Sequence, residues 1–174
     1  AAALASPDRP KADLERDAGA RPAEVLAFLG VAPGMRVADM FSAGGYYTEL
    51  LARAVGVKGQ VIAYNNPPYA KFAEKGIAAR YAANRLPNVR QVTSTLEDLE
   101  LEPASLDAAI FISTNAVRAL LSRLADDART WPARLQCFAI GRATAQSLRE
   151  AGIAPRTFDD PDNLMTWWGM AALT

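Results

Sequence analysis

The sequence predicts a single three-layer α/β domain of Rossmann-like or flavodoxin-like type, with a parallel sheet of five or six strands. Short apolar runs that are typical of buried strands alternate with helical segments along most of the chain. Such alternation forms a parallel sheet with right-handed crossovers and helices on both faces. A length of 174 residues suffices for one well-buried domain and is marginal for two.

The predicted strands are short apolar runs bounded by glycine, proline or polar residues. They are residues 35–40, 60–64, 88–93, 106–112 and 135–140, with a shorter run at 156–158. We expect the strand order 3-2-1-4 with the fifth strand beside the fourth, and a flavodoxin-like order 2-1-3-4-5 is the alternative.

The predicted helices begin and end at local signals. Pro22 takes a first helical position, and Gly30 and Gly152 end two of the helices. The expected helices are residues 22–29, 46–55, 69–84, 115–124 and 143–150. A last helix is expected from about Asp162. Its large apolar residues would cover the sheet, and they are Leu164, Trp167, Trp168 and Met170.

Residues 1–20 are expected to form a flexible, loosely attached arm with one helical turn, because they are rich in proline, charge and alanine. Residues 21–174 would then form the domain. The first residues, AAALAS, lack an initiating Met and resemble the small-residue end of a signal peptide. Export of the parent protein to a bacterial periplasm would explain them, and a trimmed alanine-rich terminus is the alternative.

Composition excludes several classes of function. The formal net charge is zero, which argues against nucleic acid or an anionic membrane surface as a partner. The arginines Arg80, Arg85 and Arg90 are too far apart to form a basic patch, and we expect them to be solvated. No apolar run is long enough to span a bilayer, so we expect a soluble protein whose partner is at most a small molecule.

Two residue types limit the chemistry further. The chain has no histidine, which removes His-based acid–base catalysis and the commonest metal ligand, so no metal is expected. Cys137 is the single cysteine and lies within an apolar run. We expect it to be a buried, unreactive thiol.

A strand–turn–helix segment, VADMFSAGGYYT over residues 37–48, predicts a site for a nucleotide cofactor. An apolar run ends in Asp39, a turn of small residues follows, and a helix begins at Tyr46. Backbone N–H groups and a helix N-terminus can then approach an anionic or polar ligand. Ligands of open α/β sheets bind at the carboxyl ends of the strands, so this turn should share an edge of the sheet with residues 64–66.

Residues 21–112 resemble the front of a class I S-adenosylmethionine-dependent methyltransferase. The resemblance is to an exported bacterial group and rests on AGARPAEVLAFLGVAPGMRVADMFSAGGYYTELLA followed by GQVIAYNNP. It implies S-adenosylmethionine as the cofactor, bound at the acidic strand end, the glycine turn, the ribose position and the adenine position. The residues at these positions are Asp39, Ala43, Gly44, Gly45, Asn65 and Thr95.

The chain departs from that family's pattern at two of these places. Phe41 stands where the family has its first glycine, and its bulk narrows the room for a ligand unless the ring turns away into the sheet. Asn65 stands where the family has Asp or Glu, and an amide lacks the charge-assisted strength of a carboxylate. Beyond Thr95, Glu97 and Asp98 could contact the adenine or simply cap a short turn. Cofactor binding is therefore expected to be weak.

The methyltransferase resemblance ends after the fourth predicted strand. Such enzymes carry acceptor-binding residues there, in this group including a His-Asp pair, whereas Ile112 here leads into STNAV. Methyl transfer depends on holding donor and acceptor in line at close range. We therefore predict no complete acceptor site and no catalytic residue.

Residues 106–174 resemble one lobe of uroporphyrinogen-III synthase, on the segments IFISTNAVRALLSRL and CFAIGRATAQSLREAGI. In that family a linear tetrapyrrole lies between two lobes, and small hydroxyl and backbone donors bind its carboxylates. The resemblance implies an anion-binding edge formed by Ser113, Thr114 and Thr144, for which helix N-capping is the alternative. Because only one lobe is represented, ring closure is not expected.

The two resemblances meet inside one predicted core strand, residues 106–112. Natural fusions join whole domains through linkers, so a junction at this place suggests deliberate recombination. We interpret the chain as an engineered chimeric α/β scaffold without complete native catalysis, which retains at most weak S-adenosylmethionine binding. A working S-adenosylmethionine-dependent methyltransferase is one alternative, and a tetrapyrrole or anion-binding module is the other.

Overall fold

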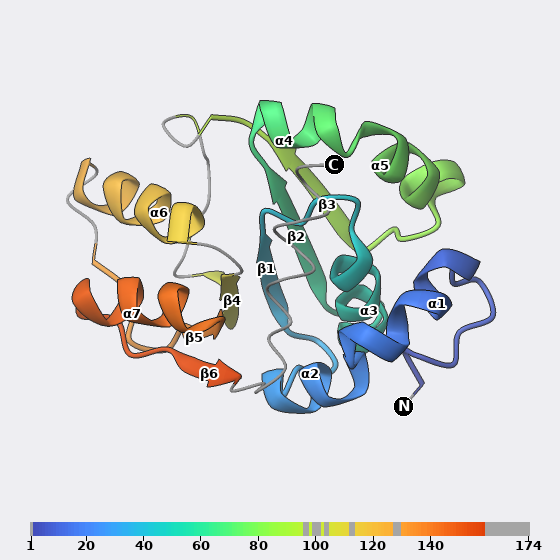
Figure 1. Ribbon diagram of the computed structural model, residues 1–174, viewed down its shortest axis with the longest axis horizontal. Helices are drawn as coiled ribbons and strands as arrows, with labels where there is room; N and C mark the ends of the chain where they lie inside the picture. The colour runs from blue at the N-terminus through green and yellow to red at the C-terminus, as the bar shows by residue number, and fades with distance from the viewer. Residues whose placement is uncertain are drawn as a thin grey trace.

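Six parallel strands form one sheet at the centre of the computed structural model (Figure 1). The structure describes residues 2–95, 98, 102, 105–111, 114–126 and 130–158. The strands are β1 (Arg36–Met40), β2 (Gln60–Asn65), β3 (Val89–Thr93), β4 (Ala108–Phe111), β5 (Gln136–Ile140) and β6 (Arg156–Phe158). Their order is β3-β2-β1-β4-β5-β6, which confirms the predicted fold class and the predicted 3-2-1-4-5 neighbours. The flavodoxin-like alternative is wrong.

Helices cover both faces of the sheet. They are α1 (Lys11–Ala20), α2 (Pro22–Leu29), α3 (Tyr46–Val55), α4 (Pro67–Phe72), α5 (Glu74–Tyr81), the 3-10 helix η1 (Ala82–Asn84), α6 (Thr114–Asp126) and α7 (Arg142–Glu150). Successive strand residues point to opposite faces of the sheet and belong to two apolar layers. Val37 and Val61 pack with α2 and α3 on one face. Ala38 and Ile62 pack with α6 and α7 on the other. The core is therefore divided by the sheet into two layers (Figure 1).

Strand register brings the carboxyl ends of the central strands together. Met40 at the end of β1 lies opposite Tyr64 of β2 and Phe111 of β4. The residues that follow β1 and β2 therefore begin side by side. Helices α4 and α5 lie at this same end of the sheet (Figure 1).

The segment after β2 differs from the single helix predicted over residues 69–84. The helix begins earlier, because the Asn66 side chain accepts a hydrogen bond from the Tyr69 N–H at 2.9 Å and two prolines occupy the first turn. Ala73, with φ −91° and ψ 6°, separates α4 from α5. The bend directs α5 toward the turn after β1.

The N-terminal region also differs from the predicted flexible arm with one helical turn. It forms the ten-residue helix α1, and its charged residues have specific partners. Arg9 and Asp17 form an ion pair at 2.6 Å, and the Tyr46 hydroxyl donates to Asp17 at 2.7 Å. The Tyr47 hydroxyl donates to the carbonyl of Ala20 at 2.8 Å. Contacts with α3 thus attach a segment whose composition alone suggests solvation.

Three further predictions concern single sites or segments. Cys137 is buried, as predicted, and burial raises the pKa of its thiol to about 12, so the thiol stays protonated and unreactive at neutral pH. The predicted last helix from Asp162 lies outside the described residues. Among the helices that the structure describes, none combines the length and apolar character needed to cross a membrane.

Candidate functional site

The turn between β1 and α3 has three residues whose backbone conformation favours glycine, and two of these three are not glycine. Phe41 with φ 64° and Ala43 with φ 50° lie in the left-handed region, as does Gly45 with φ 81°. A side chain in this region costs on the order of 1–3 kcal/mol and persists only where the surroundings fix the backbone. The backbone at the predicted cofactor turn is therefore strained and held in place by its neighbours.

Asn65 is one residue that holds the turn. Its Oδ1 accepts a hydrogen bond from the Ala43 N–H at 2.9 Å, and its Nδ2 donates to Ser42 Oγ at 3.1 Å and to the Ala43 carbonyl at 3.2 Å. A carboxylate at this position could accept the first bond but could not donate the other two. The ribose role of Asn65 stays a prediction, and in this structure its amide bonds the turn itself.

Asp39 lies near the end of β1 and faces α3. The side chain is buried, with 3% of the residue exposed, and one carboxylate oxygen accepts a hydrogen bond from Thr48 Oγ1 at 2.6 Å. Burial raises the pKa of Asp39 from 3.8 to about 6, and the Thr48 hydrogen bond offsets only part of that rise. A carboxyl group poised near neutral pH thus lies beneath the turn, where a cationic ligand group would favour its charged form.

The Phe41 ring packs toward β2 and α4. Its centroid lies 5.4 Å from that of Tyr64 and 5.8 Å from that of Tyr69, both in edge-on geometry. Tyr69 stacks in turn on Phe72 at 6.3 Å, and Phe72 is 61% exposed. A row of aromatic rings therefore leads from the buried sheet to the surface beside the turn.

Helix α5 lies directly on the turn. A Cβ atom added to Gly76 would lie 3.4 Å from the Cα of Gly44. A Cβ atom added to Gly45 would lie only 2.7 Å from both Arg80 Cδ and the Tyr81 hydroxyl oxygen. A side chain at Gly45 would collide with Arg80 and Tyr81, whereas one at Gly76 would reach only ordinary contact distance, so α5 packs closely on the turn.

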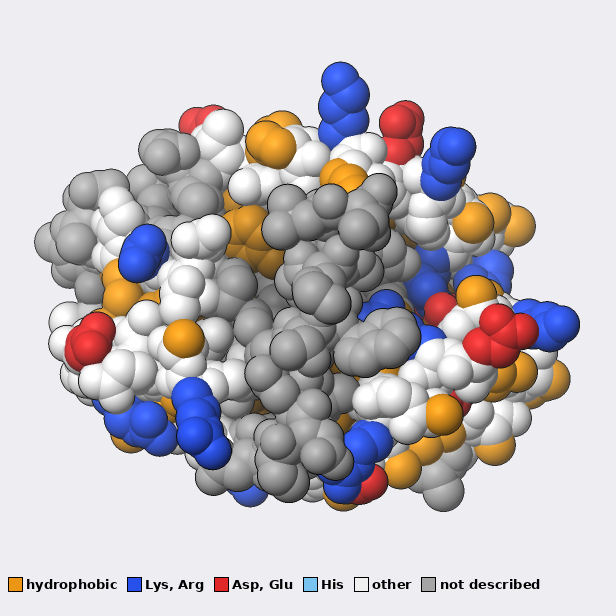
Figure 2. All heavy atoms as spheres, in the orientation of Figure 1, with side chains coloured by type: hydrophobic (Ala, Val, Ile, Leu, Met, Phe, Trp, Pro, Cys, Tyr) orange, Lys and Arg blue, Asp and Glu red, His pale blue; other side chains and the backbone are white. Residues whose placement is uncertain are grey.

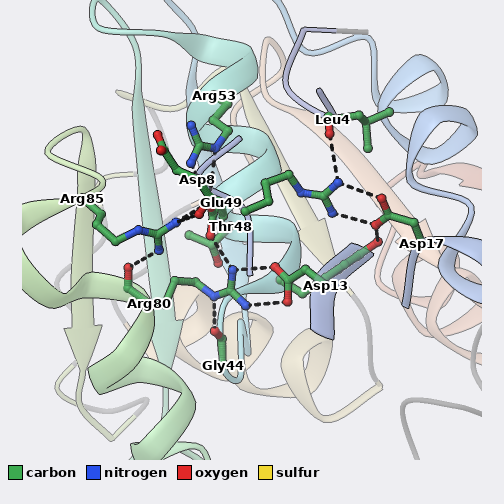
Figure 3. A network of polar contacts seen from close by, with 12 residues as sticks. Leu4, Asp8, Asp13, Asp17, Gly44, Thr48, Glu49, Arg53, Arg80 and Arg85 are labelled. Carbon is green, nitrogen blue, oxygen red and sulfur yellow. Dashed lines mark hydrogen bonds and ion pairs between the residues drawn. The ribbon is translucent and has the colours of Figure 1, made fainter. Parts of the chain in front are cut away.

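A network of buried ion pairs joins α1, α3 and α5 beside the turn (Figure 3). Arg80 Nη1 lies 2.7 Å from Asp13 and 2.5 Å from Glu49. Glu49 also pairs with Arg53 at 2.7 Å and with Arg85 at 2.9 Å. Burial alone would raise the pKa of Glu49, but the hydrogen bond from Arg53 and the charges of the other two arginines outweigh it and lower that pKa.

The sequence did not indicate this network. Arg80 and Arg85 were expected to be solvated, but Arg80 is buried and Arg85 pairs with Glu49. The acids that Arg80 meets are 67 and 31 residues away, so no local spacing or periodicity marks the pairs. The charged residues of the N-terminal segment, such as Asp13, were the one feature of the sequence related to the network, and their spacing does not identify their partners.

The other predicted site residues follow the carboxyl ends of β3, β4 and β5. Thr95 Oγ1 donates to the Asp98 carboxylate at 2.7 Å and accepts from the Asp98 N–H at 3.2 Å, which is turn-capping geometry. Thr144 is buried in the first turn of α7, and Thr114 begins α6. Ser113 lies outside the described residues.

A cavity of about 370 Å³ lies at the start of α7. Its lining includes Gly141, Gln146 and Thr157 together with two arginines, Arg142 and Arg149. Positive charge and a helix N-terminus both favour an anion at such a place. Within the described part of the chain, no cluster of acidic, cysteine or histidine side chains could hold a metal ion.

The fold is similar to that of solved S-adenosylmethionine-dependent methyltransferases. A methyltransferase of that class from Aquifex aeolicus superposes with a TM-score of 0.50 at 23% identity, over 71% of this chain and 64% of that one. Fibrillarin from Aeropyrum pernix superposes with a TM-score of 0.54 at 10% identity, over 77% of this chain and 66% of that one. The chain therefore has a methyltransferase-like fold.

Sequence comparison finds similarity to two different proteins. The tRNA (adenine(58)-N(1))-methyltransferase TrmI of Thermus thermophilus is 39% identical over 84 residues, which are 48% of this chain and 32% of that protein. The chain thus spans about a third of the length of the curated relatives it matches. The family model for uroporphyrinogen-III synthase HemD matches residues 81–165. That match supports a region similar to the synthase, although it begins before the predicted residue 106 and overlaps the methyltransferase-like segment.

Proposed function

We propose that the chain binds S-adenosylmethionine at the turn after β1, as the cofactor-binding domain of an S-adenosylmethionine-dependent methyltransferase. The observation that carries this proposal is the strained turn, in which Phe41, Ala43 and Gly45 all keep positive φ above the buried Asp39. The TrmI relative, named as a methyltransferase, supports it. So does the fibrillarin, whose crystal structure contains natively bound S-adenosyl-L-methionine.

The chemistry of the turn suits such a ligand. S-adenosylmethionine carries cationic groups and a carboxylate, and it supplies an electrophilic methyl group when bound. The Asp39 carboxylate would favour a cationic group, and the N-terminus of α3 would favour an anionic one. Helix α5 lies on the turn, so its side chains Arg80 and Tyr81 would border the bound ligand.

The acceptor is proposed to be a small molecule. The formal net charge of the chain is zero, which provides no general attraction for nucleic acid. On the face shown in Figure 2, the acidic and basic side chains are dispersed and do not gather into one basic patch.

Titration calorimetry with S-adenosylhomocysteine tests the proposal. We expect saturable binding that Asp39→Ala weakens at least tenfold, because the substitution removes the carboxylate beneath the turn. Asp107→Ala is the matched control, since Asp107 accepts from the Arg36 N–H at the opposite edge of the sheet. Absence of saturable binding by a protein that melts cooperatively would overturn the proposal.

A second candidate function is binding of a tetrapyrrole or another polyanion. The family match over residues 81–165 and the cavity beside Arg142 and Arg149 favour it. Titration with a linear tetrapyrrole carboxylate should then show binding that Arg149→Ala weakens severalfold, while Arg118→Ala on the exposed face of α6 leaves it unchanged. Equal affinity in both variants would exclude the cavity as the binding site.

The composite origin of the chain is also a proposal. The two halves share one continuous sheet, in which β4 pairs with β1 on one side and with β5 on the other. Similarity to a methyltransferase and to the synthase family within one chain supports the interpretation of the chain as a chimera. Its engineered origin and the periplasmic location of one parent stay predictions.

A further inference from the structure

We propose that Arg80 is the residue that binds the carboxylate of the cofactor's amino-acid group, and that Asp13 of α1 occupies this place when no ligand is bound. The N-terminal helix then competes with the ligand for the same guanidinium group. This inference rests on the proposed function.

The Arg80–Asp13 contact has the geometry of a bound carboxylate. Nη1 lies 2.7 Å from Asp13 Oδ2, and Nη2 lies 3.0 Å from Asp13 Oδ1. Two parallel hydrogen bonds of this kind are the preferred way for arginine to hold any carboxylate, including that of a free amino acid. The Asp13 side chain therefore imitates the ligand group that we assign to the site.

Arg80 is also fixed against the cofactor turn independently of Asp13. Its Nε donates to the Gly44 carbonyl, and its Nη1 donates to Glu49 at 2.5 Å. Figure 3 shows these bonds converging on one guanidinium group between the turn and α1. If Asp13 withdraws, the guanidinium keeps two anchors and presents the edge that Asp13 had occupied.

The local charges favour an exchange of one carboxylate for another. Among the described residues, Glu49 is shared by Arg53, Arg80 and Arg85, and Asp13 is the second acid bonded to Arg80. Withdrawal of Asp13 leaves three positive charges against one negative charge beside the turn. An incoming carboxylate restores the balance, so the vacated place selects an anionic group.

Helix α1 is attached in a way that permits this exchange. Only Asp13 and Ala20 of the helix are buried, and Leu14, its large apolar residue, is half exposed. The helix is held chiefly by polar contacts, such as the bonds of Tyr46 to Asp17 and of Tyr47 to Ala20. The helix therefore contributes little apolar surface of its own, and its movement chiefly breaks polar contacts and uncovers Tyr46 and Tyr47.

Two ligands that differ in the amino-acid group test the inference. S-adenosylhomocysteine has the carboxylate, whereas 5′-methylthioadenosine has the nucleoside and thioether without it. The readout is the ratio of the two affinities, measured by calorimetry on the full chain. Asp13→Asn should raise the preference for S-adenosylhomocysteine about tenfold because it removes the competing charge, and Arg80→Gln should lower that preference about tenfold.

Asp107→Asn is the control, because Asp107 accepts from the Arg36 N–H at the opposite end of the sheet and contacts neither α1 nor Arg80, so the ratio should stay unchanged. A thermal melt of each variant establishes folding, and Asp13→Asn alone decides the outcome if Arg80→Gln does not fold. Equal changes for both ligands in Asp13→Asn would overturn the inference and leave the proposed function standing. Failure of every folded variant to bind either ligand would overturn both.

Discussion

Replacing Glu49 with alanine is expected to lower the free energy of unfolding by about 3–5 kcal/mol, because a buried ion-pair network loses its central acid. Glu49 is 1% exposed and pairs with three arginines. Without it, Asp13 is the acid that remains bonded to Arg80, and uncompensated positive charge stays buried between α3 and α5. Urea denaturation followed by circular dichroism measures the change.

The control for this prediction is Glu24→Ala. Glu24 pairs with Arg21 at the surface, where the side chains are 51% and 37% exposed, so the loss should stay below about 1 kcal/mol. Comparable losses in the two variants would show that burial does not strengthen the network.

The contribution of Glu49 to stability also depends on pH. Because folding lowers the pKa of Glu49 from 4.5, its stabilisation is full above that value and is lost as the pH falls through the folded pKa. The unfolding free energies of the native chain and Glu49→Ala should therefore differ least in strong acid.

The elements that the sequence predicted are those set by local patterns. The bounds of α2 and α3 are correct because Pro22, Gly30 and Gly56 mark helix ends within a few residues of each apolar stripe. Alternating strands and helices with right-handed crossovers fit two strand orders, and the choice of 3-2-1-4 rested on the methyltransferase resemblance. The turn after β1 was located from its small residues and the acid before it.

The features that the sequence did not predict depend on contacts between distant residues. Alanine is a strong helix former, so local propensity gives no reason for the non-helical backbone of Ala73 that separates α4 from α5. The attachment of α1 depends on Arg80, which Asp13 meets 67 residues away. Asn65 was identified as a site residue, but its bonding to the turn depends on a backbone shape that only the folded chain shows.

Asp39→Asn is expected to stabilise the protein at neutral pH but not at pH 4. Folding raises the pKa of Asp39 from 3.8 to about 6, so its contribution to stability is full below the unfolded value and is lost as pH rises through the folded value. A rise of this size corresponds to roughly 3 kcal/mol. Asparagine does not titrate, and its side-chain oxygen can still accept the hydrogen bond from Thr48.

Urea denaturation of both proteins at intervals from pH 4 to pH 8 measures this effect. The difference in unfolding free energy should grow by most of that amount between pH 4 and pH 7 and then level off. Asn88→Ala, which removes a non-titrating side chain bonded to the carbonyls of Ala52 and Gly56, serves as the control and should shift stability by a constant amount. Parallel curves for Asp39→Asn and the native chain would mean that Asp39 titrates normally.

The same pH dependence connects stability with the proposed ligand site. A cationic ligand group beside Asp39 would favour the charged carboxylate and remove the cost of its burial. S-adenosylhomocysteine, whose ammonium group is cationic, should therefore stabilise the native chain more at pH 7 than at pH 5 and should lose this pH dependence in Asp39→Asn. Asp39 destabilises the free protein at neutral pH, and the cationic group of the proposed ligand would remove this cost by pairing with the carboxylate.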